Sequence, residues 1–140
     1  MTRDTRRTIC KIANYMTQKG ANQSEAWKSA WKMYNEGIIV SLEGTNWTDS
    51  QVGLRSNIGA YIAIINCNGK YGNTYRKLQI RSGSNNLGFL PSKIGNMLKY
   101  TDTVPFIDVE LYIKQVNGQF EAKVKLRIVD RVPKVLSFAV

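Results

Sequence analysis

The N-terminal part of the chain spaces its apolar residues three or four positions apart, as amphipathic helices do. The first apolar stripe predicts a helix over residues 3–19 that ends at Lys19-Gly20, because glycine favours the position just after a helix. The second stripe, rich in aromatic residues, predicts a helix over residues 22–36 that opens with a capping pattern at Asn22 and Glu25. Since only a short turn separates the two stripes, we expect a helical hairpin.

From Gly37 onward the apolar residues alternate with polar ones or form short β-branched runs, which predicts strands. Two alternating runs flank Asn117-Gly118, the dipeptide that most favours a tight turn between antiparallel strands. One run is apolar on both faces, which predicts a central strand, and another alternates, which predicts a half-buried strand. The central strand is 60–67, the half-buried strand is 75–81, and the other predicted strands are 38–40, 87–90, 107–116, 120–129 and 134–139.

Two segments between these strands have other patterns. Residues 44–59 are rich in Gly, Ser and Asn, which predicts a loop, and we expect Trp47 to anchor it. Pro91 suits the first position of a helix and predicts a short helix over residues 92–99. The whole order predicts an α+β fold in one compact unit. A helical hairpin over 1–36 precedes a small, mainly antiparallel β-barrel or curled sheet over 37–140, with one short inserted helix.

The residue composition narrows the chemistry. The 140 residues include no histidine, which excludes His-dependent triads and His-ligated metal sites. Cys10 and Cys67 cannot supply the four ligands of a structural zinc site, so we expect two core thiols, no metal and no cofactor. No apolar run approaches the roughly eighteen residues of a membrane span, and no secretory signal pattern follows Met1. We therefore expect a cytoplasmic protein.

The charge is strongly positive and unevenly distributed. Twenty Lys and Arg residues against ten Asp and Glu residues give a net charge of +10. Residues 70–99 hold six basic residues and no acidic one, and residues 1–36 hold seven basic residues against three acidic ones. Such an excess favours a polyanionic partner such as nucleic acid, with a merely solvated basic face as the alternative.

Tyrosines lie among the cations of residues 70–99. Cations can follow phosphates while aromatic rings stack on bases, at about 1–3 kcal/mol per base. The candidate nucleic-acid-binding residues are therefore Lys70, Tyr71, Tyr75, Arg76, Lys77, Arg81 and Lys93. For Tyr71 and Tyr75, packing against the fold is an equal alternative, and Phe89, beside Leu87 and Leu90, is expected in the core.

The segment from Leu78 to Leu98 resembles the second half of HIRAN domains. It has their strand, a turn at Asn85-Asn86, the step Gly88-Phe89-Leu90-Pro91 and a short helix ending in Leu98. The hairpin over 107–129 is similar to their closing strands. The resemblance implies an OB-like barrel that holds single-stranded DNA, often at a 3′ end, which favours DNA over RNA. It implies ligand contacts at Tyr71, Tyr75, Arg76 and Lys93.

The segment from Ser24 to Lys32, with its two tryptophans, resembles a short helix at the front of small phage and mobile-element proteins. This resemblance implies a phage or mobile-element protein in a bacterial host cell, and proteins of that kind are often anti-defence factors such as CRISPR inhibitors. The helical spacing of Trp27, Trp31 and Tyr34 favours a core stripe. An exposed remainder of Trp27 and Trp31 would be a protein-binding patch.

An enzyme is not expected, because the ten acidic residues are scattered along the chain. Asp108 and Glu110 share one strand face, and with Lys123 or Lys125 they could form the D-x-E-x-K arrangement of a metal nuclease. The alternative, which we favour, is that these carboxylates pair across the hairpin with its basic residues.

The sequence therefore supports two hypotheses for the function. The first is a non-enzymatic nucleic-acid-binding module, preferring single-stranded DNA or DNA ends. The second is an anti-defence inhibitor, of the anti-CRISPR type, that binds a nucleic-acid-handling host enzyme through Trp27 and Trp31. The sequence leaves the oligomeric state open.

Overall fold

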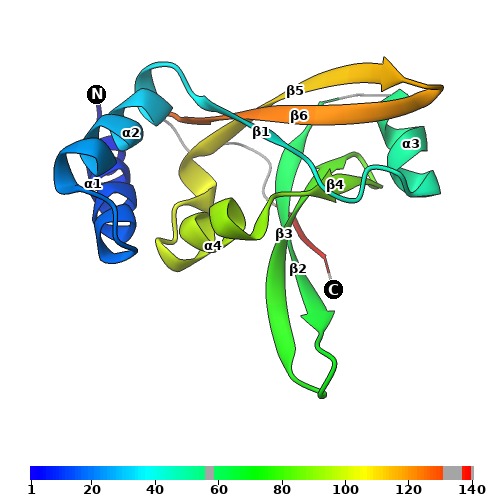
Figure 1. The fold of residues 1–140 in the computed structure, drawn as a ribbon, viewed down its shortest axis with the longest axis horizontal. Helices are drawn as coiled ribbons and strands as arrows, with labels where there is room; N and C mark the ends of the chain where they lie inside the picture. The colour runs from blue at the N-terminus through cyan, green and yellow to red at the C-terminus, as the bar shows by residue number, and fades with distance from the viewer. Residues whose placement is uncertain (56–58, 131–136, 140) are drawn as a thin grey trace.

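The computed structural model of the protein describes residues 1–55, 59–130 and 137–139 (Figure 1). Its helices are α1 (Arg3–Gln18), α2 (Gln23–Asn35), α3 (Thr48–Arg55) and α4 (Ser92–Tyr100), with a 3-10 turn at Val104–Phe106. Its strands are β1 (Ile38–Ser41), β2 (Tyr61–Asn68), β3 (Thr74–Ser82), β4 (Asn85–Phe89), β5 (Ile107–Val116), β6 (Gln119–Ile128) and β7 (Ser137–Ala139).

The predicted helical hairpin is confirmed, because α1 and α2 pack against each other. Side-chain caps begin both helices. The Thr2 hydroxyl accepts a hydrogen bond from the backbone N–H of Thr5, and the Asn22 side chain accepts from the N–H groups of Ser24 and Glu25. These bonds satisfy donors that have no partner within the helix, so each helix starts where its cap stands.

The predicted α+β class is also confirmed, but the described strands form two small sheets rather than one closed barrel. One sheet has the order β1-β6-β5, and the other has the order β4-β3-β2-β7. Neighbouring strands are antiparallel except β2 and β7. Residues 134–136 of the predicted last strand lie outside the described residues.

The β5–β6 hairpin follows the predicted alternation. Val124, Leu126 and Ile128 are buried. On the other face, Asp108 lies opposite Arg127 and Glu110 lies opposite Lys125 in the strand register, as predicted. The period of two therefore directs one face of β6 into the core and leaves opposite charges facing each other outside.

Residues 44–59 are not a simple loop, because α3 occupies Thr48–Arg55. Trp47 does not anchor this segment, since its side chain is 59% exposed. Gln51 does so instead: its amide donates to the Phe120 carbonyl at 2.9 Å, and its Oε1 accepts from the Phe120 N–H at 2.8 Å. The Gln51 amide thus pairs with β6 as a backbone peptide group would. Because Phe120 is 69 residues away, the local sequence pattern could not predict this contact.

The predicted half-burial of residues 75–81 is wrong at Gln79. Leu78, Gln79 and Ile80 are all buried, so both faces of β3 are covered at this point, with α4 against the face of Leu78. Gln79 is satisfied there by the Arg81 guanidinium, which donates to its Oε1 at 2.7 Å. A buried polar side chain with such a partner keeps the strand intact despite the broken alternation.

One hydrophobic core joins the helical hairpin to the strands. It includes Ile12 of α1, Met33 of α2, Leu98 of α4 and Leu126 of β6. Asp130, just beyond β6, links this strand to α1 and α2 at the surface. It accepts hydrogen bonds from the Thr5 hydroxyl at 2.9 Å and from the Tyr34 hydroxyl at 3.1 Å.

The two sheets meet at an isolated bridge between Glu43 and Phe89. The Glu43 N–H donates to the Phe89 carbonyl at 2.9 Å, and the Phe89 N–H donates to the Glu43 carbonyl at 2.8 Å. Gly88 makes this approach possible. Its φ is +148°, and a Cβ at this position would lie 2.8 Å from the Glu43 oxygen.

We expect Gly88→Ala to lower the free energy of unfolding by about 1–3 kcal/mol, because alanine is strained at this φ and its methyl group collides with the Glu43 carbonyl. Urea denaturation followed by circular dichroism measures the change. Gly95→Ala is the matched control: its nearest contact would be Leu78 at 3.9 Å, and in a helix it should be neutral or stabilising by about 0.5–1 kcal/mol. Equal stability of the two variants would contradict the proposed role of Gly88.

We expect Asp130→Asn to lower the melting temperature near neutral pH. The hydrogen bond from Thr5, followed by that from Tyr34, holds the pKa of Asp130 below its ordinary value of 3.8. The ionised carboxylate therefore stabilises the fold fully above that ordinary value, and the contribution disappears as the pH falls through the lowered pKa. Thermal scans should show the gap between wild type and variant closing in acid. A gap for Asp130→Asn that is constant with pH would refute the prediction.

Candidate nucleic-acid interface

The β2–β3 hairpin projects from the body of the molecule as a long arm (Figure 1). Its tip is a turn in which the Gly69 N–H donates to the Asn73 carbonyl at 2.6 Å. Lys70 is exposed there, and the Tyr71 side chain is 89% exposed. Because this ring is mostly exposed, it is available to stack on a planar ligand.

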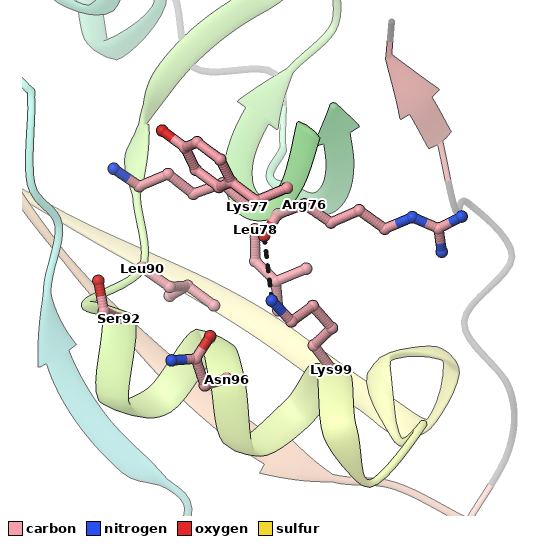
Figure 2. Close-up of a pocket in the computed structure, with 9 residues that line it drawn as sticks. Arg76, Lys77, Leu78, Leu90, Ser92, Asn96 and Lys99 are labelled. Atoms are coloured by element: carbon pink, nitrogen blue, oxygen red, sulfur yellow. Dashed lines mark hydrogen bonds between the residues drawn. The ribbon is translucent and has the colours of Figure 1, made fainter. Parts of the chain in front are cut away.

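Where the arm joins the body, α4 packs against β3 and leaves a cavity of about 360 Å³ (Figure 2). The strand contributes Tyr75, Arg76 and Lys77 to its lining, and the helix contributes Ser92, Asn96 and Lys99. The three helical residues are spaced four and three apart, which places them on one face of α4. Buried Leu78 and Leu90 form the apolar floor on which this polar lining rests.

Lys99 connects the helix to the strand. Its Nζ donates to the Arg76 carbonyl at 3.2 Å, the bond drawn in Figure 2. Arg76 and Lys77 extend in opposite directions from β3 in the same view, as neighbours in a strand must. The Lys77 Nζ lies 4.3 Å from the centre of the Phe89 ring, so a cation–π contact holds this lysine against β4.

A second hollow, of about 530 Å³, lies beside the first and shares Tyr75, Arg76 and Lys99 with it. Tyr100 lines this hollow as well. The Tyr75 side chain is 48% exposed and the Tyr100 side chain 69% exposed, so two accessible rings lie beside the two cations. Among the described residues, those that line the two hollows include no acidic side chain. The site can therefore offer positive charge to phosphates and ring faces to bases.

The structure brings together only some of the residues selected from the sequence. Tyr75, Arg76 and Lys77 line the cavity, whereas Lys70 and Tyr71 lie at the tip of the arm. Lys93 is exposed on α4 but lines neither hollow. Arg81 lies toward the other end of β3.

The guanidinium of Arg81 is engaged within its own sheet. It donates to Gln79 at 2.7 Å and to the Ser84 carbonyl at 2.6 Å, which bridges the β3–β4 turn. Through these bonds, Arg81 stabilises the β3–β4 turn and the buried Gln79.

Ser92, Asn96, Lys99 and Tyr100 were not selected from the sequence, although they complete the site. Their spacing on the predicted helix was a usable signal, because it places the first three on one face. The pattern could not indicate that this face lies over β3, since only tertiary packing decides which strand a helix covers.

The two tryptophans of α2 differ in their surroundings. Trp27 is half-buried and packs against the core, whereas Trp31 is 38% exposed and lies edge-on to Tyr34, with ring centres 6.2 Å apart. Both line a shallow hollow of about 610 Å³ together with Lys28 and Lys32. The sequence left the choice between core and interface open, and the structure places Trp27 nearer the core and Trp31 nearer the surface.

Asp108 and Glu110 lie opposite basic residues on β6, and Lys123 lies opposite Tyr112. In the part of the chain that the structure describes, no three His, Cys, Asp or Glu residues gather as metal ligands. Cys10 and Cys67 are free thiols, and the prediction that they lie in the core is wrong, because both are only half-buried.

No protein-family model, curated protein or solved structure matches the chain. The resemblance of residues 75–130 to HIRAN domains and that of the N-terminal helices to phage proteins therefore stay predictions from the sequence. None of the helices within the described ranges has the length and apolar character needed to cross a membrane.

Proposed function

We propose that this chain is a non-enzymatic nucleic-acid-binding module and that β3 and α4 form its binding surface. The observation that carries the proposal is the grouping of Tyr75, Arg76, Lys99 and Tyr100 around one hollow with no acidic residue in its lining among the described residues. Arg76 and Lys99 come from segments 23 positions apart, yet a hydrogen bond joins them. Cations next to exposed rings match the alternating phosphates and bases of a nucleic-acid strand.

The ligand that suits this surface best is single-stranded DNA or a DNA end. The rings of Tyr75 and Tyr100 can stack only on bases whose faces are accessible, and a duplex hides those faces in its own stack. The resemblance to HIRAN domains supports DNA over RNA. The separate resemblance of Ser24 to Lys32 to a front helix of small phage and mobile-element proteins supports such an origin, with action in the cytoplasm of a bacterial host.

We expect the double variant Arg76→Glu/Lys77→Glu to weaken binding of single-stranded DNA at least tenfold, because it reverses two charges beside the cavity. Fluorescence anisotropy with labelled single-stranded DNA, duplex DNA and RNA, at about 50 and 200 mM salt, measures this loss. The dependence of affinity on salt should also become shallower, by about 0.7 in log–log slope for each phosphate contact removed.

The matched control is Lys114→Glu/Lys123→Glu, which changes the net charge equally but alters exposed residues of β5 and β6. The proposal requires the control to bind more tightly than the Arg76/Lys77 variant. Equal losses would mean that only overall charge matters, and no binding by the wild type would refute the function itself.

A second function is favoured by the exposure of Trp31: inhibition of a nucleic-acid-handling host enzyme through α2. Tryptophans are frequent anchors of protein interfaces, and Lys28 and Lys32 beside the hollow would complement an acidic enzyme surface. This function requires tight binding to a protein and little intrinsic affinity for nucleic acid.

If that second function holds, Trp31→Ala should weaken the protein complex by about 2 kcal/mol, or roughly thirtyfold, as loss of an interface anchor does. Affinity capture from nuclease-treated bacterial lysate, followed by titration of the captured enzyme, measures the change. Tyr112→Ala removes another exposed ring, 42% accessible on β5, and serves as the control. Equal retention of the enzyme by both variants would count against Trp31 as an anchor.

A further inference from the structure

Tyr100 connects the proposed binding surface to the helical hairpin. Its ring stacks on that of Tyr15 from α1, with ring centres 6.5 Å apart and planes inclined by 17°. A cation lies against each ring: the Lys99 Nζ is 4.9 Å from the centre of the Tyr100 ring, and the Lys19 Nζ is 5.6 Å from that of Tyr15. Rings and cations therefore continue from the hollow onto α1.

Packing of the core does not account for this arrangement at Tyr100. A ring that served only to fill space would be covered, whereas the Tyr100 side chain is 69% exposed. Tyr15, by contrast, is half-buried and packs against the core, which holds its ring in place. The stack thus combines a fixed ring with an accessible one.

The surface continues along α1 beyond Tyr15. Arg7, Lys11, Tyr15 and Lys19 follow one another at intervals of four residues, which sets them in a ridge along one side of the helix. The three basic members of this ridge are exposed. In Figure 1, α1, α4 and β3 follow one another across the molecule, and α4 contacts both of the others.

From these contacts we infer that the ridge of α1 and the hollows between β3 and α4 form one continuous surface for a single strand of nucleic acid, joined by the Tyr15–Tyr100 stack. The strand runs from the hollow at Arg76 and Lys99, across Tyr100, to Lys19 on the helical hairpin. This inference rests on the proposed function and extends it, because it assigns the N-terminal helix a direct part in binding.

The inference predicts that Lys19 matters only for strands long enough to reach it. We would measure the affinities of oligothymidylates of about 4 to 16 nucleotides for wild type and for Lys19→Glu. A strand confined to the hollow should bind both proteins equally, whereas the longer strands should bind the variant about three- to tenfold more weakly. Tyr15→Leu keeps an apolar side chain in the core but removes the ring. It should likewise weaken the binding of the longer strands only.

Arg6→Glu is the matched control, because it makes the same change of charge on the same helix. Nine residues at 100° each place Arg6 on the side of α1 opposite Tyr15. Equal affinities of Lys19→Glu and Arg6→Glu for every length would overturn the inference. The proposed function would survive that result if Arg76→Glu/Lys77→Glu still lost more affinity than Lys114→Glu/Lys123→Glu. It would fail together with the inference if wild type bound no oligonucleotide.

Discussion

The rest of the structure depends on burial of the inward face of β6. Val124, Leu126 and Ile128 are fully buried, and α1, α2, α3, β1 and β5 all contact this strand. Each of these elements has too small an apolar face to be stable alone, so burial of apolar surface in the core that they share with β6 stabilises them. Hydrogen bonds then hold the two ends of β6. The Gln51 amide donates to the Phe120 carbonyl near one end, and Asp130, just beyond the other end, accepts from Thr5 and Tyr34.

The proposed binding surface lies where this packing leaves β3 and α4 partly uncovered. Leu78 and Leu98 are buried in the shared core, while Arg76 and Lys99, toward the edge of the same elements, stay near solvent. Burying six cations without partners would cost far more than the fold could offset, so residues 70–99 cannot contribute their charges to the interior. The fold instead gathers several of them at the base of an arm, beside exposed tyrosines.

Local signals predicted much of the fold but a smaller part of the candidate site. Helix caps, the Asn117-Gly118 turn and the alternation in β5 and β6 depend on near neighbours, so their elements could be predicted from the sequence. The helix at Thr48–Arg55 could not, because Gln51 pairs with Phe120, 69 positions away. The burial of Gln79 could not either, because tertiary packing covers both faces of β3. In the site, the acid-free stretch indicated Tyr75, Arg76 and Lys77, yet it also indicated Arg81, whose guanidinium bonds to its own sheet.

The sequence by itself determined the helical hairpin, the α+β class and the concentration of positive charge in two segments, because propensity, period and charge are properties of near neighbours. Only the tertiary structure decided that the strands divide into two sheets, that α4 covers β3, and that Tyr15 meets Tyr100 across 85 positions of chain. Those outcomes follow from which apolar faces fit together in the core. The competition among such faces involves the whole chain at once, and no local pattern records its result.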